Sequence, residues 1–120
     1  MKQPHEILIG DNSLLNTLVD EIKIFKDEKW ILNISIKFSN FSKKSEYISL
    51  VLLFVNVKEY NFYHNQMFEF YNVESFKFFK KGEDYYLSLD PDNKLDSYSE
   101  EDMDYVLSSE VKIILDDDAL

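Results

Sequence analysis

Apolar and polar residues alternate with a period of two along nearly the whole chain from residue 21 to residue 89. This period puts every second side chain on the same face of an extended strand, so the pattern predicts β-strands rather than helices. The signal is clearest at 30–38, WILNISIKF, where we predict a half-buried strand. Its upstream partner is EIKIF at 21–25, joined to it through the polar turn 26–29. The apolar face of the 30–38 strand is predicted to hold Trp30, Leu32, Ile34, Ile36 and Phe38.

Three further strands are predicted downstream. Segment 46–57, EYISLVLLFVNV, is apolar on both faces, which indicates a central strand that is covered on two sides. In segment 68–79, FEFYNVESFKFF, the aromatic residues change phase near 73–75, as they would at a bulge or bend. The turn around Gly82 then leads into YYLSL at 85–89. Five antiparallel strands in succession form a meander.

Two segments remain ambiguous. Residues 103–115 keep a two-residue period, which favours a sixth strand, but Ser99 and the acids after it could also begin a helix over 99–107. Near the N-terminus, NSLLNTLVDEI at 12–22 has the spacing of a short helix, although the chain could already be extended from Val19. The sixth strand would place on one face Met103, Tyr105, Leu107, Val111, Ile113 and Leu115.

The composition fits one compact domain over residues 1–120, with residues 116–120 as a frayed tail. Of the 120 residues, 45% are hydrophobic and 16% aromatic, which is enough apolar surface to form one core. We therefore predict a mainly β, single-domain antiparallel meander of five or six strands. The sheet is expected to be curved or sandwich-like, with a short N-terminal helix as an option.

Charge is distributed unevenly. The net charge is −10, but residues 1–82 carry +1 and residues 83–120 carry −11. Every basic side chain is Lys, so the chain lacks the planar guanidinium of Arg, which donates two hydrogen bonds at once to a phosphate or a guanine. An acidic surface would repel a nucleic-acid backbone and attract a basic protein.

Several classes of protein are disfavoured by what the sequence lacks. Without Cys, the chain has no disulfides, no thiolate metal sites and no Cys nucleophile. No segment reaches the roughly 20 apolar residues of a membrane-spanning helix, and the N-terminus lacks the pattern of a secretory signal. We expect a cytoplasmic protein with no cofactor, no bound metal and no contact with nucleic acid or membrane.

The densest acidic stretch is residues 85–105, YYLSLDPDNKLDSYSEEDMDY. A calcium loop beginning at Asp90 fails, because Lys94 would stand at a ligand position and Leu95 where the sharp turn needs Gly. The stretch could be a turn followed by a solvated surface, or a docking face. The candidate partner-binding carboxylates are Asp90, Asp92, Asp96, Glu100, Glu101, Asp102 and Asp104.

Catalysis has no support in the sequence. Acid–base chemistry needs carboxylates in contrasting environments within a cleft, and these acids are expected at the surface. Of the two histidines, His5 falls in the expected N-terminal tail and His64 in a turn. No catalytic residues are predicted, and the protein is expected not to be an enzyme.

Aromatic residues concentrate between residues 54 and 86, where twelve rings occur. Such density is typical of core packing, and it could also line a ligand cavity. Three exposed tyrosines could instead serve as interface anchors beside the acids: Tyr60, Tyr63 and Tyr71.

The phrase FYNVESFKFFKKGEDYYLSLDPDN, followed by SEEDMDYVLSSEV, resembles small acidic bacterial proteins that are found beside polymorphic toxins and are regarded as immunity proteins. The resemblance covers residues 55–111, and its motifs are structural. It implies an antiparallel β-rich fold, no cofactor, and a task done by binding and neutralising a toxin.

Two hypotheses of different classes follow. In the first, the acidic face docks on a basic protein, such as a nuclease-like toxin. In the second, the sheet encloses an aromatic-lined cavity that binds a small molecule. The chain could be a monomer or could dimerise through an open edge strand.

Overall fold

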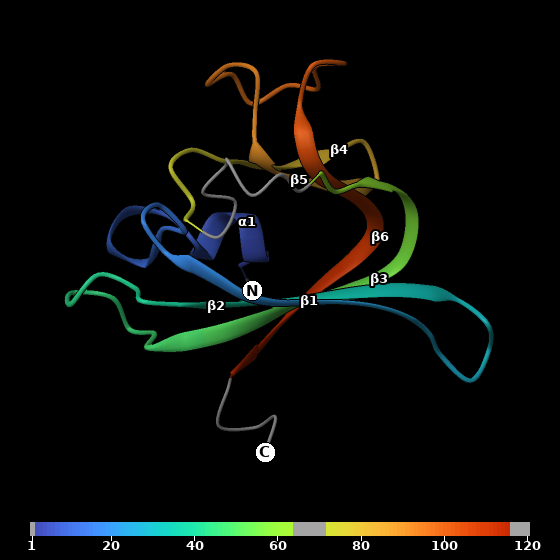
Figure 1. Ribbon diagram of the computed structural model, residues 1–120, viewed down its shortest axis with the longest axis horizontal. Coiled ribbons are helices and arrows are strands. Elements are labelled where there is room, and N and C mark those ends of the chain that lie inside the picture. The colour runs from blue at the N-terminus through green and yellow to red at the C-terminus, as the bar shows by residue number, and fades with distance from the viewer. Residues whose placement is uncertain (1, 64–71, 116–120) are drawn as a thin grey trace.

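The computed structural model of the chain describes residues 2–63 and 72–115. Within these residues the fold is mainly β and antiparallel, which confirms the predicted fold class (Figure 1). No helix among them is long and apolar enough to cross a membrane. The elements in chain order are α1 (Pro4–Ile7), the 3-10 turn η1 (Gly10–Asn12), β1 (Leu18–Lys26), β2 (Leu32–Ser39), β3 (Ser49–Asn61), β4 (Lys77–Lys81), β5 (Asp84–Asp90) and β6 (Met103–Leu115).

The strands form one sheet with the order β1-β2-β3-β6-β5-β4, and every pair of neighbours is antiparallel. The order differs from a consecutive meander because β6 lies between β3 and β5. This position suits β6, since Val106 and Val111 on it are buried and would lose cover at the edge of the sheet. The predicted sixth strand at 103–115 is confirmed, and the helix considered for 99–107 is wrong.

The sheet curls about β6. Residues 105–108 of β6 pair with both β3 and β5, whereas the rest of β6 pairs with only one of them. Irregularities between Val19 and Glu21 and between Val57 and Glu59 add bends. Figure 1 shows β6 curving between a lower half made of β1, β2 and β3 and an upper half made of β4 and β5, with α1 in the gap.

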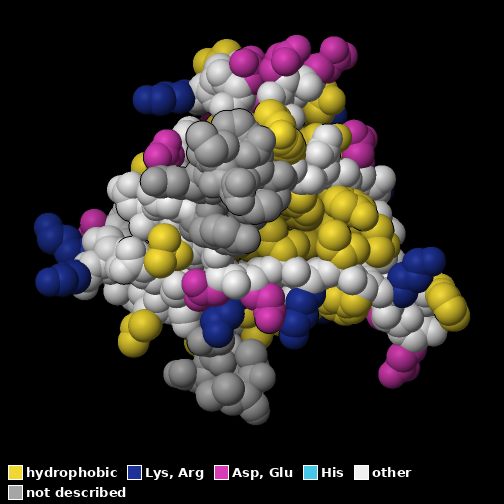
Figure 2. Space-filling view, in the orientation of Figure 1, with side chains coloured by type: hydrophobic (Ala, Val, Ile, Leu, Met, Phe, Trp, Pro, Cys, Tyr) yellow, Lys and Arg dark blue, Asp and Glu magenta, His cyan; other side chains and the backbone are white. Residues whose placement is uncertain are grey.

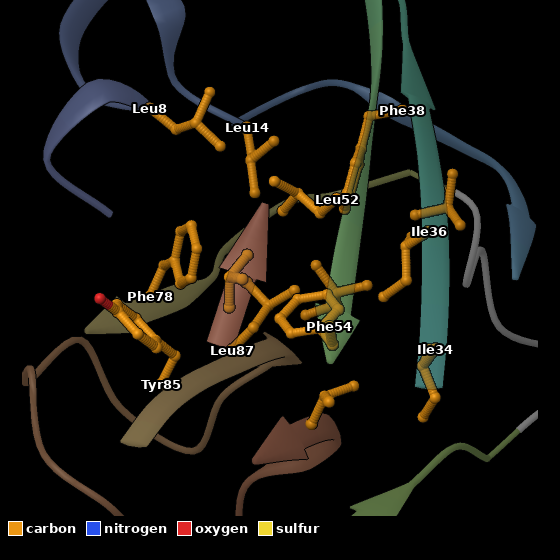
Figure 3. Packing of buried hydrophobic residues seen from close by; sticks show 14 of the residues in the cluster. Leu8, Leu14, Ile34, Ile36, Phe38, Leu52, Phe54, Phe78, Tyr85 and Leu87 are labelled. Carbon is orange, nitrogen blue, oxygen red and sulfur yellow. The ribbon is translucent and has the colours of Figure 1, made fainter. Parts of the chain in front are cut away.

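The hydrophobic core fills this gap. Figure 3 shows side chains from β2, β3 and β5 pointing toward one another, with Leu8 and Leu14 of the N-terminal segment closing one side. Much of the predicted aromatic cluster is core, as the burial of Phe54, Phe78 and Tyr85 shows.

Strand β3 is central, as predicted, because it lies between β2 and β6. Its two faces differ in cover. Leu50, Leu52 and Phe54 are fully buried, whereas the residues between them are half-buried, so only one face is closed off from solvent. At Asn56, where φ is +58°, the alternation shifts and Val57 returns to the core.

Trp30 was predicted on the buried face, and this is wrong: its side chain is 78% exposed. The reason is the turn at Asp27, whose carboxylate accepts hydrogen bonds from the amides of Lys29 at 2.8 Å and Ile31 at 3.1 Å. This turn holds Trp30 at φ +63°, so the strand begins only at Leu32.

The N-terminal region also differs from prediction. The short helix is α1, Pro4–Ile7, and not the segment 12–22, which is already in β1 from Leu18. Residues 14–16 form a turn before β1, and backbone hydrogen bonds from the Asn16 amide to the Val73 carbonyl and from the Val73 amide to the Thr17 carbonyl hold this turn beside Val73. The predicted strand at 68–79 begins only at Lys77 in the described part, after the expected bend, and residues 68–71 lie outside the described residues.

Candidate functional site

The acidic stretch forms the connection between β5 and β6, which we call the acidic loop (residues 91–102). Figure 2 shows Asp and Glu side chains gathered at the top of the molecule, where Figure 1 places this loop. None of the exposed carboxylates of the stretch forms an ion pair in the described part of the chain. The predicted site residues that are exposed are Asp90, Asp92, Asp96, Glu100 and Glu101.

Asp102 was predicted to belong to this surface, and this is wrong, because it is only 4% exposed. The ammonium of Lys77 donates to both Asp102 carboxylate oxygens at 3.0 Å. The hydroxyl of Tyr86 donates to Oδ2 at 2.8 Å. The amides of Asp92 at 2.8 Å and Ser99 at 3.1 Å complete five hydrogen bonds to this one carboxylate.

The electrostatics of Asp102 follow from these bonds. Burial by itself raises its pKa, but the hydrogen bonds from the Asp92 amide, Lys77 and Tyr86 outweigh burial, so the pKa lies below its ordinary value of 3.8. The carboxylate therefore remains charged at neutral pH. Burial raises the pKa of Tyr86 well above 10.0, and the hydrogen bond that Tyr86 donates to the charged Asp102 raises it further.

Lys77 is the partner that sequence reasoning missed. It is 1% exposed and also donates to the carbonyl of Ser97 at 2.8 Å, so its ammonium is bonded to the loop through both side chain and backbone. The sequence gives one signal of its burial: Lys77 stands two residues before Phe79, so it shares a face of β4 with an aromatic residue. Nothing local connects it with an aspartate 25 residues away.

Aromatic rings surround this ion pair on the face of β4 and β5 that lies opposite the main core. The ring centroid of Tyr86 lies 5.1 Å from that of Phe79 and 5.7 Å from those of Tyr98 and Tyr105. The ammonium of Lys81 lies 4.2 Å from the Tyr98 ring centre. The acidic loop is thus packed on a small polar and aromatic cluster, which fixes its backbone.

Asp104 was also predicted to be on the surface, and it is 5% exposed. It accepts a hydrogen bond from the Tyr63 amide at 2.8 Å, which ties the end of β3 to the start of β6. Burial raises the pKa of Asp104, the Tyr63 bond opposes this, and the nearby charge of Asp90 adds to the rise. Its backbone has φ +51°.

The predicted tyrosine anchors have different outcomes. Tyr60 and Tyr63 are 41% and 39% exposed at the end of β3, where the register places them beside the start of β6 and so near the base of the acidic loop. Tyr71 lies outside the described residues.

A second feature is a hollow of about 380 Å³ between the N-terminal segment and β4. His5, which was expected in a free tail, is part of its wall and packs with ring centroids 6.2 Å from Phe78 and 5.7 Å from Tyr85. The Nδ1 atom of His5 is buried with no hydrogen-bond partner in the described part of the chain. The hollow is lined by His5, Leu8, Ile9, Gly10, Ser13, Leu15, Phe76, Phe78, Phe79 and Asp96.

Within residues 2–63 and 72–115, no group of three or more His, Asp or Glu side chains is placed to hold a metal ion. His64 lies outside the described residues. Comparison of the chain with protein-family models, curated proteins and solved structures finds no match. The function must therefore be inferred from the acidic loop and the hollow themselves.

Proposed function

We propose that this protein is a non-enzymatic binding module that docks on a basic protein through its acidic loop. The observation that carries the proposal is the combination of an exposed charge cluster with a fixed backbone. Five carboxylates face solvent without an ion-pair partner in the described residues, while the buried Asp102–Lys77 pair holds the loop that carries most of them.

A fixed loop favours binding because less conformational freedom is lost on association. Clustered charge of one sign raises the rate of encounter with an oppositely charged partner and disfavours wrong partners. Tyr60 and Tyr63, half-exposed near the base of the loop, would supply ring surface next to the charges.

The kind of partner follows from the resemblance to immunity proteins. We propose a bacterial toxin with a basic, nuclease-like surface, which the acidic loop would cover, and a cytoplasmic site of action. The cluster now proposed for docking excludes Asp102 and Asp104, because both are buried.

The test begins with the reading frame next to this gene, where we expect a protein that ends in a basic, toxic domain. With that domain purified, we expect rapid association that slows steeply with added salt. A variant with Asp92→Asn, Asp96→Asn, Glu100→Gln and Glu101→Gln should associate about tenfold more slowly at low salt.

The matched control neutralises four exposed acids in the N-terminal half: Asp11, Asp20, Glu28 and Glu46. Both variants lose the same net charge, so a loop-specific site predicts a much smaller effect from the control. Equal rates for the two variants, or an unchanged rate for the loop variant, would remove the acidic loop from the docking site.

The hollow favours a second candidate function, a small-molecule-binding β protein. Phe76, Phe78 and Phe79 contribute ring surface to it, and its volume of about 380 Å³ fits a small ligand. This function does not exclude the first, because the hollow and the exposed loop share only Asp96.

A further inference from the structure

The hollow offers apolar surface that the protein itself leaves uncovered. On the wall formed by the N-terminal segment, Ile9 is 60% exposed and Leu15 is 47% exposed. On the β4 side the lining residues are three phenylalanines. Apolar surface around a hollow of this size is what an apolar or aromatic ligand would cover.

The charged groups at the hollow indicate whether that ligand is a cation or an anion. Among the described residues that line the hollow, Asp96 is the only acidic or basic one besides His5, and it forms no ion pair with any described residue. Of the three lysines of β4, Lys77 is paired with Asp102. Lys80 and Lys81 lie over the rings of Tyr85 and Tyr98. The carboxylate is therefore free to meet a cation from outside the protein.

Aromatic rings and a carboxylate together form an environment that suits an organic ammonium group. The negative face of a phenyl ring attracts a cation, and Asp96 supplies the opposite charge. A neutral or anionic ligand of the same shape would gain only from burial of its apolar part.

We propose that the hollow binds a small organic cation, an aryl- or alkyl-ammonium compound whose charged group meets Asp96 and whose apolar part packs against Phe76, Phe78 and Phe79. This inference rests on the second candidate function, and its site shares only Asp96 with the acids proposed for docking.

The probes are 2-phenylethylamine, which is protonated at neutral pH, and 2-phenylethanol, which is neutral and has nearly the same shape. Binding to the full chain is measured by amide chemical-shift changes in NMR titrations. We expect the amine to bind about five- to tenfold more tightly than the alcohol, the preference that one screened ion pair and a cation–ring contact supply. The shifts should cluster at residues 5–15 and 76–79.

Three variants locate the effect. Asp96→Asn should bring the two probes to nearly equal affinity, while Glu101→Gln, an exposed acid of the same loop outside the hollow, should keep the preference. Ile9→Lys puts a cation on the wall of the hollow and should weaken amine binding. Ile9 lies outside the acidic loop, so this variant should leave docking of the toxin domain unchanged.

Each contrary result overturns one part of the proposal. Equal affinity for the amine and the alcohol, with shifts in the hollow, overturns the cation assignment and leaves a small-molecule site. No shifts there up to about 10 mM amine, a concentration that would reveal binding of a few kcal/mol, overturn the site itself. A preference that survives Asp96→Asn overturns the role of that carboxylate.

Discussion

Replacing Asp102 with Asn should strongly destabilise the protein, although the two side chains have nearly the same shape. The carboxylate accepts five hydrogen bonds, two of them from the buried ammonium of Lys77. Asn supplies one oxygen and one NH₂ group in place of two oxygens, so in either orientation its NH₂ faces a donor. Lys77 then remains buried without a counter-charge.

Removing one partner of a buried ion pair costs about 3 to 5 kcal/mol. For a chain of this length that is a large part of the total stability, which is of order 10 kcal/mol. With a urea dependence of about 1.5 kcal/mol per molar, the midpoint should fall by about 2 M or more. We would follow unfolding by far-UV circular dichroism, because the single Trp is exposed and reports poorly on the core.

A double-mutant cycle isolates the pair. Lys77→Met keeps the apolar stem, and the double variant with Asp102→Asn should lose at least about 1.5 kcal/mol less than the sum of the two single variants. Asp96→Asn, which removes an exposed carboxylate, is the control and should change stability by less than about 0.5 kcal/mol. Additive losses in the cycle, or a cost below about 1 kcal/mol for Asp102→Asn, would refute the buried pair as the anchor of the loop.

Three further changes should have effects of known sign. Because burial raises the pKa of Asp104 above 3.8, the folded state binds this proton more tightly than the unfolded chain, and stability falls as pH rises through the folded pKa. Asp104→Asn should therefore stabilise the protein more at pH 7 than near pH 3.5, and equal urea midpoint shifts at the two pH values would contradict this. Trp30→Asn should stabilise the protein by about 1 kcal/mol in urea unfolding, because Asn tolerates the positive φ of this exposed turn position better than a bulky ring; a loss of stability would show that the ring contributes to the fold. The hydrogen bond to Glu59, together with burial, raises the pKa of Tyr105 to about 12, so Glu59→Gln should move one tyrosine in an ultraviolet pH titration back toward 10, and an unchanged titration curve would exclude this assignment.

The fold class could be predicted because a two-residue period is a local property that each strand carries in its own sequence. The bend near residue 74 and the strand at 103–115 follow from the same pattern. The strand order could not be predicted this way, since the pairing of β6 with β3 depends on contacts between residues that are 44 to 65 positions apart. Trp30 has the same phase as the strand that follows it, so the pattern alone cannot show that the Asp27 side chain sets a turn that includes Trp30.

Five of the seven predicted docking acids are exposed, and the two failures have one cause. The two-residue period places Met103, Tyr105 and Leu107 on one apolar face of β6, but the structure buries the opposite face at the start of this strand. Met103 is 39% exposed, whereas Asp104, Val106 and Ser108 are buried on the other face. Polar residues can occupy such positions only when distant parts of the chain supply their partners.

Those partners differ between the two buried aspartates, and the difference explains why one loop is both acidic and fixed. Asp102 receives an ammonium, a hydroxyl and two amides, which lower its pKa and keep it charged inside the protein. Burial raises the pKa of Asp104, the Tyr63 amide opposes this rise, and the nearby charge of Asp90 adds to it. A charged Asp102 attracts the backbone of the loop through the amides of Asp92 and Ser99, which draws the loop inward and leaves the remaining carboxylates facing outward. The acids that could meet a partner are therefore positioned by the one acid that cannot, and a change at Asp102 should weaken docking without touching the partner.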